Sequence, residues 1–132
     1  AFGIWEWTWT RTGNFEFWLT NNAKDTMAMH AGVGYLVYLK AGELLSLTRS
    51  TGSASTPLQE VALPLADYPE GSQLRMRVVR FADGSFEVYV NDELKITAWD
   101  NHYTASKYIG IYCWNAMNGW VDDIRLTKFL TH

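Results

Sequence analysis

Cysteine is nearly absent from this chain, which has a single one, Cys113, among 132 residues. One thiol cannot form an intrachain disulfide, and it cannot supply a cysteine cage for zinc. Cys113 shares a strand face with Ile109 and Ile111 in the alternating pattern, so we expect a small buried thiol. Transition-metal binding is not expected either, because the histidines and the cysteine have no ligand-like spacing.

Concentrated positive charge and long apolar runs are also missing. The net charge is -3, and the densest basic group is Arg75 and Arg77 with Arg80 nearby. Nucleic acid is not an expected partner, because phosphate binding needs many cationic contacts. No apolar run could span a bilayer, so we expect no membrane partner. At 132 residues the chain has the size of one domain, over 1–132. Because it begins almost directly in a strand at Phe2, we expect a mature domain or one excised from a larger secreted protein.

Recognisable catalytic patterns are absent as well. Acid–base hydrolysis of glycosides needs two carboxylates about 5–10 Å apart, and Glu6, Glu16 and Glu87 are each the only acid of their predicted strand. Asp122 and Asp123 are adjacent, so a strand would point them to opposite faces. There is no Gly-x-Ser-x-Gly elbow for a serine nucleophile. We therefore expect no enzyme, although a glycan hydrolase or lyase stays open if carboxylates or tyrosines converge from separate strands.

The sequence does contain period-two alternation of apolar and polar residues along most of its length. Seven Trp, seven Tyr and six Phe fall almost entirely within these alternating runs. Turn residues punctuate the runs every eight to twelve residues, and no helical pattern appears, which predicts an all-β, antiparallel two-sheet β-sandwich of about ten strands. The expected strands are residues 3–11, 15–20, 35–40, 43–49, 58–63, 73–81, 86–90, 94–98, 108–114 and 120–126.

Alternation also assigns the two faces of each strand. Trp5, Trp7 and Trp9 oppose Glu6 and Thr8, so we expect all three indoles in the core, because burying the charged set would cost several kcal/mol per unpaired group. Other aromatic residues then point outward. Flat outward rings are typical of a surface that stacks on sugars, with arginine, asparagine and acidic side chains, Glu16 among them, binding the hydroxyl rim.

The expected carbohydrate-binding residues are Trp18, Tyr89, Trp99, Tyr112, Trp114, Arg75, Arg77 and Asn91. These aromatic residues could instead simply cover the sheet, because strands favour Tyr and Trp in any case. Alternation does not say which of the two sheets is concave, and that decides which outward aromatics share one surface.

Three short segments carry a family resemblance. They are Phe2-Gly-Ile-Trp-Glu-Trp, the hairpin over residues 74–94 with its Asp-Gly turn, and the closing Trp120-Val-Asp-Asp-Ile-Arg-Leu. They resemble the concanavalin A-like lectin/glucanase superfamily, in its laminin G-like and carbohydrate-binding-module branches. The resemblance implies a jelly roll that binds glycan on its concave sheet or edge loops. The Glu-x-Asp-x-x-Glu catalytic strand of the family 16-type glucanases is absent from this sequence.

The same resemblance raises the question of calcium. Many related modules hold a structural calcium through the acidic residue of the last strand, which would be Asp122 or Asp123 here. Calcium takes six to eight oxygen ligands, and no dense Asp/Asn cluster accompanies these two residues. We expect no required cofactor and leave a structural calcium open.

These observations predict a non-catalytic carbohydrate-binding module that stacks aromatic side chains on a polysaccharide or oligosaccharide. We expect a monomer tethered to other domains, such as a glycoside hydrolase, in an extracellular, cell-surface or virion protein. The alternative is a structural or adhesion sandwich that binds protein or glycan through the same aromatic face.

Overall fold

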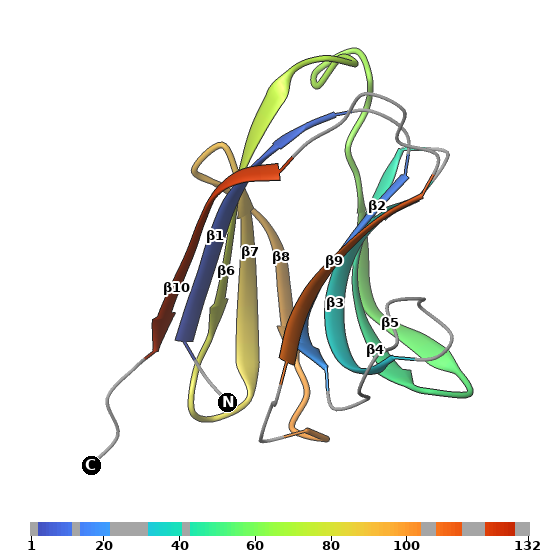
Figure 1. The fold of residues 1–132 in the computed structure, drawn as a ribbon, viewed down its shortest axis with the longest axis vertical. Helices are drawn as coiled ribbons and strands as arrows, with labels where there is room; N and C mark the ends of the chain where they lie inside the picture. Colours follow the sequence, from blue (N-terminus) through green and yellow to red (C-terminus); the bar gives the residue numbers. More distant parts are fainter. Residues whose placement is uncertain are drawn as a thin grey trace.

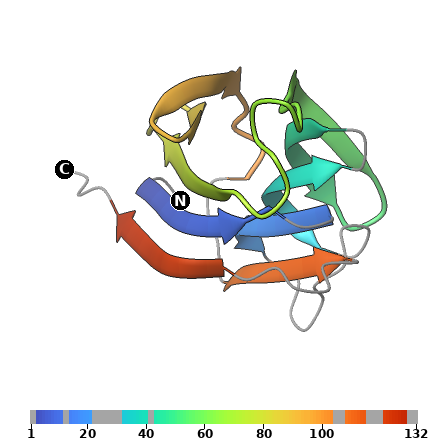
Figure 2. The ribbon, with the colours of Figure 1, turned by 90° about the horizontal axis from the view of Figure 1, so that it is seen from above.

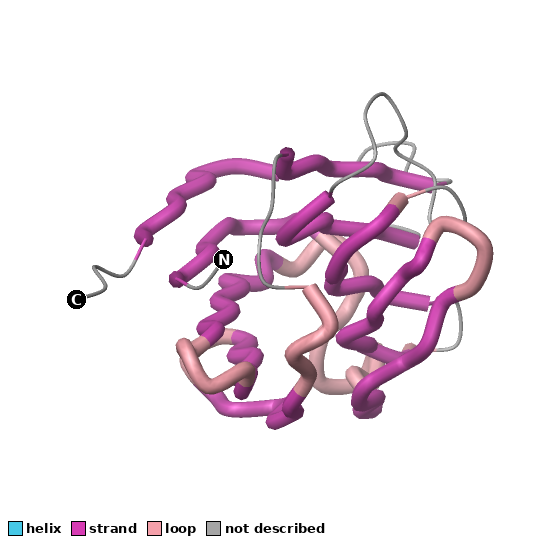
Figure 3. Tube along the Cα trace, turned by 90° about the horizontal axis from the view of Figure 1, so that it is seen from below, coloured by secondary structure: helices cyan, strands magenta, loops and turns pink. Residues whose placement is uncertain are grey.

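The computed structural model describes residues 3–11, 14–21, 32–40, 43–103, 108–114 and 121–128. The strands in these ranges are β1 (Gly3–Thr10), β2 (Asn14–Asn21), β3 (Val33–Lys40), β4 (Leu44–Thr51), β5 (Ser55–Ala62), β6 (Gln73–Arg80), β7 (Ser85–Val90), β8 (Glu93–Trp99), β9 (Tyr108–Trp114) and β10 (Val121–Lys128). Strands joined by loops make up the described chain (Figure 3). None of its segments is a helix with the length and apolar character to cross a membrane.

The strands form two five-stranded antiparallel sheets that lie as two layers (Figures 1 and 2). Sheet A has the order β10-β1-β6-β7-β8, and sheet B has the order β5-β4-β3-β2-β9. The chain crosses between the sheets repeatedly, since β1, β6 to β8 and β10 belong to sheet A and the others to sheet B. The predicted all-β, two-sheet sandwich is confirmed.

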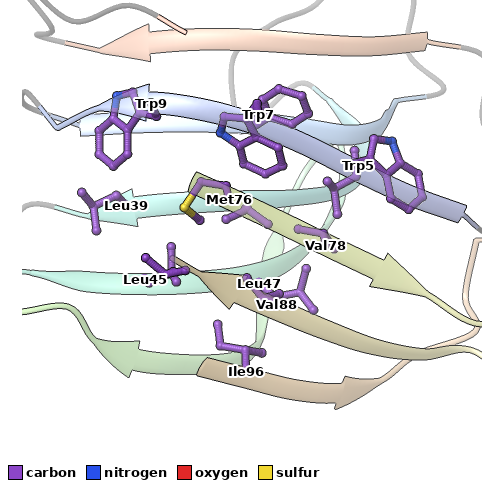
Figure 4. Packing of buried hydrophobic residues seen from close by; sticks show 14 of the residues in the cluster. Trp5, Trp7, Trp9, Leu39, Leu45, Leu47, Met76, Val78, Val88 and Ile96 are labelled. Atoms are coloured by element: carbon purple, nitrogen blue, oxygen red, sulfur yellow. The ribbon is translucent and has the colours of Figure 1, made fainter. Parts of the chain in front are cut away.

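The core lies between the inner faces of the two sheets. Trp5, Trp7 and Trp9 of β1 are all buried in it, as the alternation predicts (Figure 4). The ring of Trp7 stacks on Phe17 of the opposite sheet, with centroids 3.8 Å apart and planes 7° from parallel. Large aromatic contacts of this kind dominate the stability of a domain of this size.

A buried polar network joins β3 and β4 of sheet B to the segment after β8 of sheet A. The carboxylate of Asp100 accepts a hydrogen bond from the Tyr35 hydroxyl at 2.6 Å and forms an ion pair with Arg49. Burial alone would raise the pKa of Asp100, but these bonds and the backbone N–H of His102 hold that pKa below its ordinary value. The network fixes Asp100, and so anchors the chain immediately beyond Trp99.

Candidate functional site

A hollow of about 440 Å³ lies on the outer face of sheet A, over β10, β1, β6 and the turn between β7 and β8. We call this hollow the sheet A groove. Its charged lining residues are Glu6, Arg75, Arg77, Asp92, Asp123 and Arg125.

Strand alternation places these side chains on the outside. Arg75 and Arg77 alternate with Leu74, Met76 and Val78, whose apolar side chains are buried in the core. The solvation of the charged set and the burial of the apolar set therefore favour the same orientation of β6. The predicted outward placement of the two arginines is confirmed, and both are exposed.

The register aligns opposite charges across neighbouring strands. Glu6 on β1 lies directly opposite Arg77 on β6 and directly opposite Arg125 on β10. Arg77 Nε is 3.7 Å from Glu6 Oε1. On its other side, Arg77 lies opposite Tyr89 of β7, with the guanidinium carbon 5.5 Å from the centre of the tyrosine ring. One row of the sheet therefore combines two arginines, one carboxylate and one aromatic plane.

The turn between β7 and β8 brings a second carboxylate to the groove. Asn91 and Asp92 both have positive φ, at 50° and 68°, as a type I′ hairpin turn requires. Asn91 Oδ1 accepts a hydrogen bond from the Arg75 backbone N–H at 2.9 Å. This bond holds the turn against β6, where Asp92 Oδ2 lies 2.9 Å from Arg75 Nη2. Asn91 thus has a structural partner for its amide oxygen, and its predicted contact with sugar stays a prediction.

Trp99 lies on the same outer face, at the end of β8, and is 65% exposed. Its indole Nε1 donates a hydrogen bond to the backbone carbonyl of Asp83 at 2.7 Å. Asp83 belongs to the turn before β7, where Gly84 has φ of 95° and a Cβ would lie 3.2 Å from the Trp99 nitrogen. The turn therefore fixes the indole while leaving most of it exposed to solvent.

Trp99 and Tyr89 share the outer face of sheet A at different heights. Trp99 lies opposite Ser85, four residues along β7 from Tyr89, which corresponds to roughly 13 Å at the usual strand rise. Glu87 lies between them, and partial desolvation, followed by the charge and hydrogen bond of Glu87, raises the pKa of Tyr89. The two aromatic side chains and the sheet A groove thus lie on one face of sheet A, with Tyr89 beside Arg77 of the groove and Trp99 farther along the sheet.

The structure corrects the prediction for Trp18, which is fully buried at 0% exposure. The face assignment was right, because its neighbours Phe17 and Leu19 lie in the core. The outer face of sheet B, however, is covered around Trp18. The backbone of Gly32 packs onto the Trp18 ring so closely that an added Cβ would lie 2.3 Å from it. Trp18 therefore cannot act as an exposed stacking platform in this structure.

Glu16, expected at a hydroxyl rim, is a second correction on the same face. It is 3% exposed, and neither carboxyl oxygen has a hydrogen-bond partner among the residues that the structure describes. Burial raises its pKa to about 7. Sequence alternation gave no sign of this environment, because it separates the two sides of a sheet without saying which side meets solvent.

Several predicted residues lie beyond the described side chains. The backbone of β9 is described, but the side chains of Tyr112, Cys113 and Trp114 are not, and neither is that of Asp122. Asp123 has φ of 54° and lies where the pairing of β1 with β10 shifts register. The described part of the chain has no group of three His, Cys, Asp or Glu side chains that could hold a metal. The calcium site stays an untested prediction.

The comparisons with known proteins bear on the fold. No family model matches the chain, and no curated protein matches its sequence. Among solved structures, the chain is similar to the carbohydrate-binding module CBM66 from Bacillus subtilis, with a TM-score of 0.77. The sequences are 18% identical, over 97% of this chain and 76% of the other. The shared fold is a β-sandwich. The resemblance to the concanavalin A-like superfamily has no family match behind it and stays an inference from sequence.

Proposed function

We propose that this domain is a non-catalytic carbohydrate-binding module whose ligand lies along the outer face of sheet A, from the sheet A groove to Trp99. The proposal rests on the fixed and exposed side chain of Trp99. Its indole nitrogen is already bonded to the backbone, and its ring is fixed and largely exposed. A fixed and exposed indole offers a flat apolar plane on which a sugar ring can stack.

The chemistry of the surface suits a sugar. The C–H face of a sugar ring packs against an aromatic plane, which Trp99 and Tyr89 supply on one sheet face. Hydroxyl groups both donate and accept hydrogen bonds, and the groove offers guanidinium donors beside carboxylate acceptors. The fold likeness to a carbohydrate-binding module supports the same proposal. Affinity at one such open site would be modest and would be raised by several contacts with one polymer.

The proposed role is to hold an attached domain on a polysaccharide outside the cell or at a cell or virion surface. Its non-catalytic part is supported by the absence of glycosidase motifs from the sequence. The raised pKa of Glu16 would suit a general acid. Glu16 is, however, buried on sheet B, away from the proposed ligand surface on sheet A, and this position also supports a non-catalytic role.

The test is retention of the purified domain on a glycan array and on insoluble cellulose, chitin and xylan. We expect Trp99→Ala to reduce retention about fivefold or more, because a base stacked on an aromatic side chain contributes about 1–3 kcal/mol and a sugar face packs against the same kind of plane. Leu44→Ala, which removes an exposed apolar side chain from sheet B, is the matched control and should bind normally. Full retention of Trp99→Ala, or no retention of the wild type on any glycan, would contradict the proposal.

A second function has one specific observation in its favour. The edge strand β10 exposes two large apolar side chains, Ile124 and Leu126. Exposed apolar residues on a sheet edge suit contact with another protein, as in a structural or adhesion domain. Concentration-dependent association that Leu126→Asp abolishes, together with no glycan binding, would favour this function over the first.

A further inference from the structure

The sheet A groove has no excess of either charge. Its charged lining consists of three arginines and three carboxylates, namely Arg75, Arg77, Arg125, Glu6, Asp92 and Asp123. A groove built for an anionic ligand would be expected to leave arginines without resident acidic partners, because bidentate binding of a carboxylate or sulfate occupies the guanidinium fork.

Two of the three carboxylates lie beside an arginine, and each lies beside a different one. Glu6 lies between Arg77 and Arg125 in the register of three neighbouring strands, and its Oε1 is 3.7 Å from Arg77 Nε. Asp92 lies 2.9 Å from Arg75 and is held there by the type I′ turn. Both pairs are exposed, so each stabilises the fold by less than about 1 kcal/mol. Their main consequence concerns the ligand, because the two carboxylates offset the positive charge of the arginines that it meets.

We propose that the sheet A groove selects uncharged sugars over uronic acids and sulfated sugars, and that Glu6 and Asp92 set this selectivity. The inference rests on the proposed function. An incoming carboxylate that binds Arg77 or Arg75 must displace Glu6 or Asp92 from that arginine, and at any of the three arginines it comes close to the remaining carboxylates; both effects oppose binding. A neutral sugar meets no such opposition, since its hydroxyls donate to the carboxylates and accept from the guanidinium groups.

The experiment compares retention on neutral polymers (cellulose, chitin, xylan) and acidic polymers (polygalacturonate, alginate, heparin) at 50 and 500 mM NaCl. The proteins are the wild type, Glu6→Gln, Asp92→Asn and the control Asp67→Asn. Asp67 is exposed on the loop between β5 and β6 and does not line the groove, so its substitution changes the net charge equally. Asparagine tolerates the positive φ of position 92.

We expect the wild type to be retained on a neutral polymer with less than about a twofold change between the two salt concentrations, since an uncharged sugar makes no charge–charge contact that salt would screen. Glu6→Gln should gain about tenfold in retention on polygalacturonate at 50 mM NaCl, with the gain lost at 500 mM, because Arg77 then loses its carboxylate partner and Arg125 loses the acid opposite it in the register. Asp92→Asn should gain less, and Asp67→Asn should gain nothing.

Three results would overturn the selectivity. They are strong retention of the wild type on an acidic polymer, an equal gain in Glu6→Gln and Asp67→Asn, and no gain in either groove variant while neutral binding persists. Wild-type binding to acidic polymers alone would leave the proposed carbohydrate-binding function standing. No retention of the wild type on any neutral or acidic polymer would remove the proposed function, and the selectivity with it.

Discussion

The outer faces of the two sheets follow the same alternation in sequence and differ in their exposure to solvent. On sheet A several outward positions are charged and reach solvent, with Glu6, Arg75 and Arg77 at the groove. On sheet B the outward positions of β2 and β4 include Trp18 and Thr48, which are buried. Both faces follow the same period-two alternation, so alternation alone separates the two sides of a sheet and does not say which side meets solvent.

Composition distinguishes the two faces better than alternation does. The described outward residues of β2 to β4 that are buried are Glu16, Trp18, Thr20, Gly34, Leu36, Ser46, Thr48 and Ser50. Apart from Glu16 these are neutral, and hydroxyls such as Ser46 and Thr48 satisfy each other at 2.7 Å. A face of neutral side chains can be covered at little cost, whereas a face of arginines and carboxylates cannot. The charged face of sheet A is therefore the one available to a ligand.

The largest expected effect compares one tryptophan from each outer face. We expect Trp18→Ala to lower the free energy of unfolding by about 3–5 kcal/mol, as for other buried aromatic truncations. Trp99→Ala should lower it by less than about 1 kcal/mol, because Trp99 is mostly exposed and loses one hydrogen bond. Urea denaturation followed by circular dichroism measures both. If Trp18→Ala does not fold, Trp18→Phe should still lose more stability than Trp99→Ala, and equal losses would refute the burial of Trp18.

The next effect concerns the carboxyl group buried under sheet B. The pKa of Glu16 is about 7 in the folded protein against 4.5 for the unfolded reference. Between these values the unfolded chain loses its proton first, so stability falls as the pH rises from about 4.5 to 7 and then levels off. Glu16→Gln should remove this loss, raising the free energy of unfolding by up to about 3 kcal/mol at pH 8 and leaving it nearly unchanged at pH 4.

Denaturation of Glu16→Gln at pH 4, 6 and 8 checks this prediction, with Glu6→Gln as the control from the outer face of sheet A. The control should change stability by less than about 1 kcal/mol at each pH, because its ion pair with Arg77 is exposed. A Glu16→Gln variant that is less stable than the wild type at pH 8 would show that the carboxylate has a stabilising partner.

Much of the fold could be predicted from the sequence, because strand faces and hairpin turns are local properties. The inward indoles of Trp5, Trp7 and Trp9 and the outward arginines of β6 both follow from alternation. The burial of Trp18 could not be predicted in this way, since it depends on packing by chain outside the strand, such as Gly32.

The network around Asp100 was missed for a related reason. Tyr35 and Asp100 are 65 positions apart in the sequence, and Arg49 is 51 positions from Asp100. No spacing rule joins such residues before the strand order is known. The groove could be predicted only in part. Alternation on each strand predicts which residues face outward, but the alignment of Glu6 between Arg77 and Arg125 depends on the order of strands in sheet A.

The smallest expected effect is the coupling between Arg75 and Asp92 on the exposed face. A double-mutant cycle with Arg75→Gln and Asp92→Asn isolates it, because Asn keeps the backbone conformation that the turn needs. We expect a coupling below about 1 kcal/mol in urea denaturation, decreasing further in 0.5 M NaCl, since the side chains are 64% and 85% exposed. A coupling above about 2 kcal/mol would make this pair a stabilising element of the fold like the buried Arg49–Asp100 pair. A small coupling means that both residues can be substituted with little loss of stability. Any change of ligand selectivity in the same variants then reports on the groove and not on the fold.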